Sequence, residues 1–330
     1  MSRRLVFAVL VFFLTRGAFA MPPGPAQTPL ADAQKDYNAG RYSRVVDALT
    51  REVQSSRDDA SLHFLLGQSL YQLGEFQRAI TVLERAVQLA PKDSAYHDWL
   101  GKSYGRKAEG SMFLTAMGWA RKTHKEFEIA VQLNPNNFEA QRDLIRYEMN
   151  APGIVDGGDG KALKHIEDLE KLDNLEGQLA SGEFLATKKE MEKADAVFQK
   201  ILESKTDRIG VYFEVADYYR DRPNAEKMSE AISAAEKIDP DDRRLKYYRG
   251  VAIVLDGKRP NQAELLLKSY LATVPNNSDV PPHASAREWL GRLYEGQRRY
   301  SEAAQEYRLS LALDSHNKSV EEALKRVEKR

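Results

Sequence analysis

The stretch at residues 60–93, ASLHFLLGQSLYQLGEFQRAITVLERAVQLAPKD, decides the fold of this chain. A Leu-Gly pair at 66–67 recurs at 100–101, which is 34 residues further on. After the first pair, small, large and helix-stopping residues follow at fixed offsets: Ala79, Leu83, Ala86 and Pro91. Because two helices joined by a turn need this alternation to approach each other, the stretch predicts a helix–turn–helix unit that stacks on its neighbours.

This pattern resembles the tetratricopeptide repeat family over nearly all of the chain after its first thirty residues. The resemblance implies an all-α fold, a right-handed superhelical solenoid of about seven to eight helix–turn–helix repeats with a C-terminal capping helix. We expect the solenoid to cover residues 30–330. The expected repeats lie near 26–59, 60–93, 94–137, 138–174, 175–208, 209–242, 243–277 and 284–317, and the cap at 318–330.

The repeats differ in how many signature positions they carry. The three near 26–59, 138–174 and 175–208 are assigned by phase, which means from their place in the 34-residue period rather than from signature residues. They fit two irregular hairpins as well as three regular ones. The third repeat has about ten extra residues between its two helices, and the fourth has an insertion at 151–160. An all-α solenoid follows from either count.

The first twenty residues have the pattern of a targeting segment. Arg3 and Arg4 precede an apolar run at 5–14, and Ala18-Phe19-Ala20 follows it. This pattern predicts a signal peptide at 1–20 that is cleaved near Ala20, and so a periplasmic or secreted protein; an uncleaved anchor is the alternative. Four prolines between 21 and 29 predict a short extended leader.

Charge and cysteine content exclude several classes of protein. The chain has 49 basic and 49 acidic residues, and this balance does not favour nucleic-acid binding, which needs a net basic surface. It has no cysteine, so neither a disulfide framework nor a lipid anchor on an N-terminal thiol is possible. Stability must therefore come from packing.

No motif predicts a metal, a cofactor or a catalytic residue. His63 and His97 lie 34 residues apart, in equivalent slots about 10 Å apart, which is too far for one zinc with bonds near 2 Å. We therefore assign both to packing. The loop 156–160 resembles a calcium loop loosely, but glycines occupy its third and fifth positions, so we expect a turn in which Asp159 caps the next helix.

The resemblance also implies where a partner would bind. In the family, the second, fifth, ninth, twelfth and thirteenth positions of each repeat line the concave groove. In the first three repeats these positions hold Gln34, Tyr37, Asn38, Phe64, Gln68, Tyr71, Gln72, Asp98, Lys102 and Arg106. Aromatic rings beside amides suit a peptide segment of another protein. Alternatively, Phe64 and Tyr71 pack against a neighbouring first helix.

The insertion in the third repeat is apolar and flanked by basic residues. Its apolar members are Met112, Phe113, Leu114, Met117 and Trp119, and its basic neighbours are Arg106, Lys107, Arg121, Lys122 and Lys125. We expect the insertion to lengthen both helices and to pack on the second insertion at 151–160. The alternative is contact with a membrane surface or a partner helix.

These patterns predict a non-catalytic protein–protein interaction scaffold of the cell envelope, with a partner segment bound in the concave groove. Two further hypotheses belong to other classes. One is a self-associating structural envelope protein. The other is a hydrolase on an α-helical toroid, with its site at the insertions 105–122 and 151–160, which would require paired carboxylates facing each other.

Overall fold

The computed structural model describes residues 29–277, 279–315 and 317–330, and in these ranges the chain forms helices and no strand. The predicted signal peptide and nearly all of the predicted leader lie outside the described residues. None of the described helices is both long enough and apolar enough to cross a membrane.

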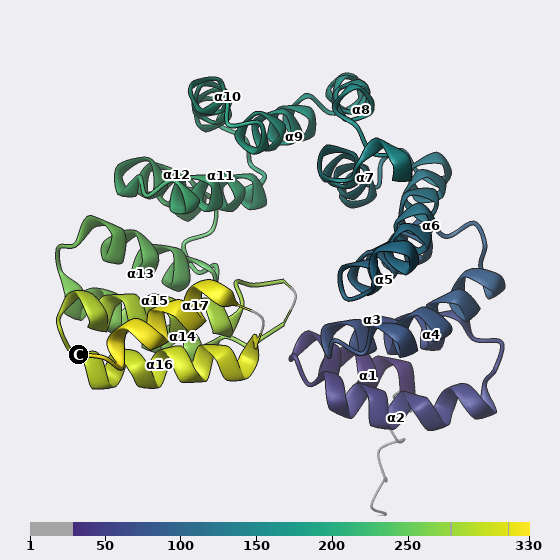
Figure 1. Cartoon of the computed structure of the whole chain (residues 1–330), viewed down its shortest axis with the longest axis horizontal. Helices are drawn as coiled ribbons and strands as arrows, with labels where there is room; N and C mark the ends of the chain where they lie inside the picture. The colour runs from purple at the N-terminus through teal and green to yellow at the C-terminus, as the bar shows by residue number, and fades with distance from the viewer. Residues whose placement is uncertain (1–28, 278, 316) are drawn as a thin grey trace, which may run out of the picture.

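Eight consecutive helix pairs and one final helix make up the described chain (Figure 1). The pairs are α1 (Pro29–Asn38) and α2 (Tyr42–Ser55); α3 (Ala60–Gln72) and α4 (Phe76–Leu89); α5 (Ser94–Glu109) and α6 (Phe113–Leu133); α7 (Phe138–Asn150) and α8 (Asp159–Leu172); α9 (Asn174–Thr187) and α10 (Met191–Glu203); α11 (Ile209–Asp221) and α12 (Ala225–Ile238); α13 (Leu245–Asp256) and α14 (Pro260–Thr273); and α15 (His283–Gly296) and α16 (Tyr300–Leu313). A 3-10 turn η1 (Gly153–Val155) precedes α8, and α17 (Lys318–Val327) closes the series. The predicted all-α solenoid with a closing helix is confirmed.

A glycine facing a large side chain fixes the close approach of the two helices in a pair. A Cβ atom added to Gly67 of α3 would lie 2.5 Å from Cγ of Leu83 in α4, so no larger residue fits there without displacing Leu83. The same relation recurs along the chain, between Gly101 and Phe127, Gly182 and Phe198, Gly250 and Leu267, and Gly291 and Tyr307. This recurring contact is the physical basis of the spacing in the sequence.

A second recurring contact ties four of the first helices to the loop before them. Side chains near the start of four first helices hydrogen-bond a backbone carbonyl six residues earlier. The pairs are His63 with Arg57 at 3.1 Å, His97 with Pro91 at 3.1 Å, Gln141 with Pro135 at 3.1 Å and Tyr212 with Thr206 at 3.3 Å. The two histidines assigned to packing therefore bind backbone oxygens in adjacent repeats.

Buried apolar side chains form three clusters along the solenoid rather than one central core. One joins α1 to α5, one joins α7 to α9, and the largest runs from α9 to α17. In α17, Val320, Ala323 and Val327 are buried while the other face is polar, so this helix covers the open end of the stack.

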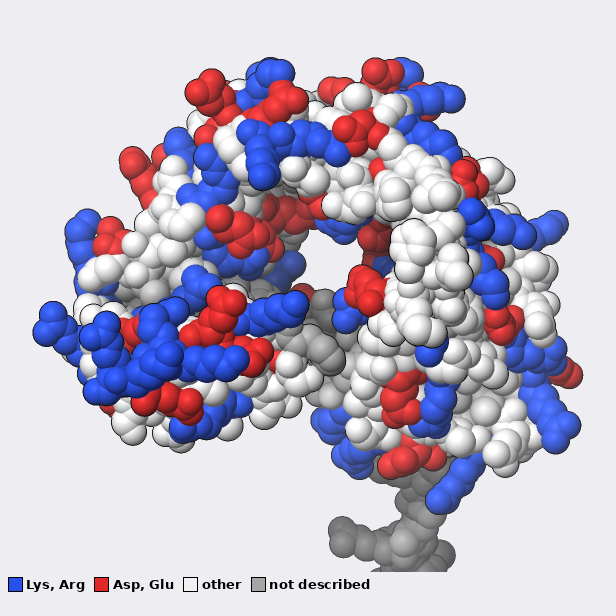
Figure 2. Space-filling model, in the orientation of Figure 1, with Lys and Arg blue, Asp and Glu red and all other residues white. Residues whose placement is uncertain are grey.

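The helix pairs curve into a ring whose two ends meet (Figure 1). The side-chain amide of Asn277, in the segment between α14 and α15, donates a hydrogen bond to the carbonyl of Asn38 at the end of α1. Gly40 lies against the same segment with a left-handed φ of +69°, and a Cβ atom there would lie 2.0 Å from the Asn276 carbonyl oxygen. The ring surrounds an opening that the space-filling view shows at its centre (Figure 2).

Gly40→Ala tests this closing contact, and Gly74→Ala is its matched control. Gly74 occupies the equivalent turn one repeat later with φ of +76°, but a Cβ atom there meets nothing within 4 Å. Both variants should lose about 1–2 kcal/mol of stability from the left-handed backbone. Only Gly40→Ala should also separate the ends and increase the maximum dimension in small-angle X-ray scattering. Equal dimensions for the two variants would contradict the closing contact.

Candidate binding surface on the concave face

The first helices of the central pairs face the centre of the ring. α7, α9 and α11 lie on the inner side, and α8, α10 and α12 lie on the outside (Figure 1). Side chains on the inner helices therefore line the concave face, where a bound segment could contact several repeats at once.

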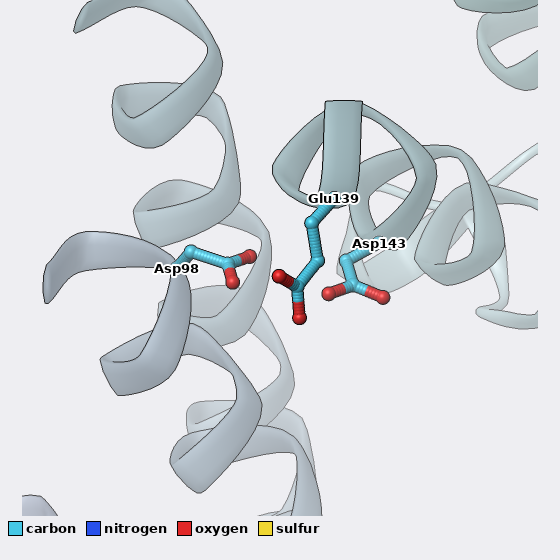
Figure 3. Close-up of side chains that lie close together, drawn as sticks. All are labelled: Asp98, Glu139 and Asp143. Carbon is cyan, nitrogen blue, oxygen red and sulfur yellow. The ribbon is translucent and has the colours of Figure 1, made fainter. Parts of the chain in front are cut away.

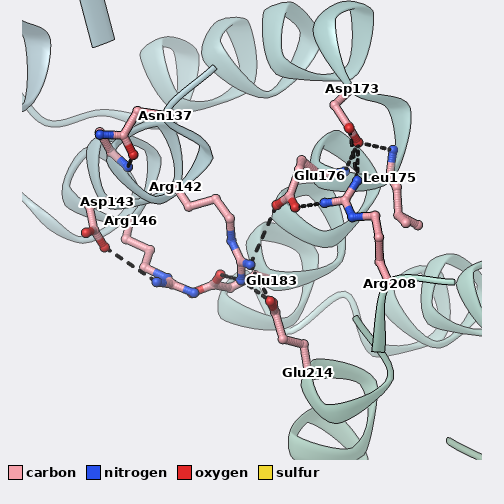
Figure 4. A network of polar contacts seen from close by, with 11 residues as sticks. Asn137, Arg142, Asp143, Arg146, Asp173, Leu175, Glu176, Glu183, Arg208 and Glu214 are labelled. Carbon is pink, nitrogen blue, oxygen red and sulfur yellow. Dashed lines mark hydrogen bonds and ion pairs between the residues drawn. The ribbon is translucent and has the colours of Figure 1, made fainter. Parts of the chain in front are cut away.

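A network of ion pairs crosses the concave face from α7 to α11 (Figure 4). Arg142 of α7 donates to Glu214 of α11 at 2.6 Å and also lies 3.7 Å from Glu183 of α9. Arg146 of α7 donates to Glu183 at 2.7 Å. At the far end, Arg208 binds Asp173 at 2.9 Å and also pairs with Glu176. These contacts fix three successive inner helices relative to one another.

The network continues into a cluster of three carboxylates around one lysine. Asp98 of α5 and Glu139 and Asp143 of α7 direct their side chains toward one another (Figure 3). Their oxygens lie within 4.8 Å of one another, close enough to hold a metal ion. However, Nζ of Lys102 lies 2.8 Å from Asp98 and 3.0 Å from Asp143, and it also pairs with Glu139. The Lys102 ammonium is thus the cation of this cluster, and a metal ion would have to displace it.

The ionisation of this cluster reflects its burial. Asp98 is 2% exposed, and burial raises the pKa of its carboxyl to about 7, although the charge of Lys102 opposes the rise. Burial disfavours the charged form of Lys102 as well, but the three carboxylates outweigh it and raise the lysine pKa. Lys102 therefore stays charged and ties α5 to α7.

A pocket of about 630 Å³ opens between α7, α9, α10 and α11. Leu179, Ala186, Met191 and Phe198 give it an apolar lining, to which the ring of Tyr218 adds. Its charged lining has both signs: Arg142, Arg146, Arg222, Glu183, Glu214, Asp217 and Asp221. An apolar side chain with charged neighbours fits this combination.

Each acidic residue of the pocket is engaged by an arginine. Glu183 and Glu214 belong to the network described above, and Arg220 contacts Asp217 at 2.5 Å and Asp221 at 2.8 Å. Burial raises the pKa of Asp217 to about 6 against the charge of Arg220, and the Tyr248 hydroxyl donates to it at 3.0 Å. This arrangement favours structural ion pairing over acid–base chemistry.

The aromatic residues predicted to line the groove are used largely in packing between repeats. Phe64 stacks on Tyr96 with ring centroids 4.3 Å apart, and Tyr71 meets Trp99 edge-on at 5.4 Å. Both of these partners lie in the neighbouring first helix, α5. Phe64 and Tyr71 remain half-buried, so each keeps part of its ring exposed.

The other predicted groove residues divide by exposure. Tyr37 is 7% exposed and packs edge-on to Tyr42, and Asp98 is buried, so neither offers a free side chain. Gln34 and Asn38 are exposed and hydrogen-bond each other at 2.9 Å. Half-buried or exposed members complete the set: Gln68, Gln72, Lys102 and Arg106.

The pocket lies in the part of the chain where the sequence pattern is weakest. Arg142, Arg146 and Glu183 belong to repeats that were assigned only by phase, and the sequence analysis did not select them. Their ion pairs join residues 37 to 72 positions apart, as for Arg146 with Glu183 and Arg142 with Glu214. A signal did exist, because charged residues recur on the inner-facing positions of successive first helices.

Two segments match models of known families. Residues 60–93 and residues 259–318 each match a model described as tetratricopeptide repeat. Together these two segments include α3, α4, α14, α15 and α16. No curated protein matches the chain.

Three similar solved structures are distant from this chain in sequence. A tetratricopeptide repeat protein from Parabacteroides merdae has 15% identity and a TM-score of 0.46, over 91% of this chain and 97% of that one. The Cut9–Hcn1 hetero-tetramer of APC/C has 14% identity and a TM-score of 0.48, over 91% and 55%. YrrB, described as a TPR protein with an unusual peptide-binding site, has 17% identity and a TM-score of 0.35, over 64% and 99%.

The buried carboxyl of Asp98 predicts a pH-dependent stability. Its pKa rises from 3.8 to about 7 on folding, so the folded state binds more protons between these values, and the free energy of unfolding falls as pH rises through this window. Asp98→Asn should remove this contribution, so the free energy of unfolding of the variant should fall less between pH 4 and pH 7 than that of the wild type. Denaturant unfolding across that range measures it. An unchanged slope in Asp98→Asn would refute the assignment.

Proposed function

We propose that this protein is a non-catalytic scaffold that binds a segment of another polypeptide on its concave face, between α7 and α11. The observation that carries the proposal is the pocket of about 630 Å³, where an apolar lining adjoins paired charges of both signs. An apolar side chain of the partner would occupy the pocket, and charged neighbours in the segment would exchange with the ion pairs around it.

The repeat architecture supports a protein partner. Stacked helix pairs create an extended concave surface, and proteins with the tetratricopeptide fold generally use such surfaces to bind other proteins. Ion pairs hold the inner helices in place before a ligand binds. The surface is therefore preorganised, and binding would cost little free energy for ordering the protein. We find no set of side chains in the described residues that points to catalysis instead.

We place this scaffold in the cell envelope, as a periplasmic or secreted protein. The support for this location is the targeting pattern in residues 1–20, with its basic start, apolar run and small-residue cleavage site. The partner would then be another envelope or exported protein.

Photo-crosslinking in the organism's own cells tests the binding surface. A photoreactive amino acid at Thr187 or at Asp221, two exposed residues of the pocket, should yield one recurrent partner polypeptide. The matched control is Ser229, which is exposed on the outer helix α12 and should not yield it. Adducts of equal yield from all three positions, self-adducts alone, or no adducts would overturn the proposal.

A substitution in the apolar lining adds a quantitative test. Met191→Asp should reduce the crosslinking yield at Thr187 about tenfold, because a charge would replace an apolar contact inside the pocket. Leu265→Asp is the control, since Leu265 is 69% exposed on α14 and lies outside the pocket. Helical circular dichroism should be unchanged in both variants. Full yield from Met191→Asp would show that the pocket does not hold the partner.

A further inference from the structure

The hairpin of α5 and α6 projects an apolar tip into solvent. α5 and α6 have 16 and 21 residues, whereas the preceding pair has 13 and 14, so the insertion lengthens both helices. At the tip, the exposed fractions are 84% for Met112, 73% for Phe113 and 81% for Leu114. Three consecutive apolar side chains with this exposure indicate a contact surface.

The rest of the predicted apolar cluster belongs to the hairpin itself. Trp119 is half-buried and stacks on Tyr104 with ring centroids 5.5 Å apart, and Met117 is half-buried as well. The second insertion meets α6 through a hydrogen bond from Arg121 to the Ile154 carbonyl at 3.2 Å. It therefore contacts α6 eight residues beyond Phe113, and it leaves the tip uncovered.

Basic side chains lie along both helices of the hairpin that carries the tip. Residues 106–125 contain Arg106, Lys107, Arg121, Lys122 and Lys125 but a single acid, Glu109, in a chain with equal numbers of basic and acidic residues. Arg106 pairs with Glu109, whereas none of the three lysines forms an ion pair with a described carboxylate. Lys122 instead lies 4.8 Å from the ring centre of Trp119. In Figure 2 the surface over α5 and α6 is largely uncharged, with charged residues at its borders.

We propose that this tip binds the surface of an anionic lipid membrane. Phe113 and its two neighbours would enter the layer between headgroups and acyl chains. Arg121 and Lys122 lie on α6 roughly 12 Å further along at 1.5 Å per residue, where they would meet lipid phosphates. A second copy of the chain is a poor occupant, because the contact would bring two basic segments together.

Single-site labelling reports on the tip alone. The chain has no cysteine, so Met112→Cys can carry a polarity-sensitive fluorophore at the tip of the full-length protein. Vesicles of phosphatidylcholine and phosphatidylglycerol in equal parts should shift its emission to the blue, and vesicles of phosphatidylcholine alone should not. Leu265→Cys, labelled in the same way, is the exposed apolar control and should not respond. Because both proteins contain residues 1–20, any lipid binding by that segment affects them equally.

Two sets of substitutions separate the apolar contribution from the charge. Phe113→Ser with Leu114→Ser should reduce vesicle partitioning of the labelled protein at least tenfold. Lys107→Gln and Lys122→Gln should each reduce it about fivefold, and more at low salt. No emission shift at position 112, an equal shift at position 265, or an equal shift with neutral vesicles would overturn the proposal. Helical circular dichroism confirms that each variant is folded.

Discussion

The close approach of two helices at a glycine is the contact on which the rest of this structure depends. Gly67 lets Leu83 sit directly against α3, and four later pairs repeat the relation. Because these five pairs are held close together, each presents its first helix to one side and its second helix to the other. The ring, its inner face and the charges on that face all follow from this repeated geometry.

The accumulated curvature of the first seven pairs brings together residues that are 239 positions apart, Asn38 and Asn277. This contact is small and polar, and it joins a turn to a loop rather than two helices. It nevertheless changes the concave surface from an open groove into the lining of a closed opening (Figure 2). A bound segment must therefore lie along the inner wall or pass through the opening, unless the contact between the ends separates.

The sequence predicted the fold because the small and the large position of each contact lie within one helix pair. They are 16 to 26 residues apart, as for Gly67 with Leu83 and Gly101 with Phe127. The site was harder to predict. Repeat phase assigns a residue such as Tyr71 to the inner side, but whether Trp99 of the next helix covers it depends on packing between repeats. Arg142 and Glu214 lie in different repeats, so their pairing depends on the curvature of the stack.

The concave face and the tip of the α5–α6 hairpin differ most in how their charges are paired. On the concave face, Arg142, Arg146 and Lys102 each contact at least two carboxylates, so little field extends beyond the surface. A partner must therefore be recognised by direct contact. Paired charges cancel each other's field, so they do not attract a partner from beyond the Debye length of about 8 Å. At the hairpin tip, Lys107, Lys122 and Lys125 have no carboxylate partner among the described residues, and their field reaches into solvent. The same chain thus combines a surface suited to a specific segment with one suited to an extended anionic surface.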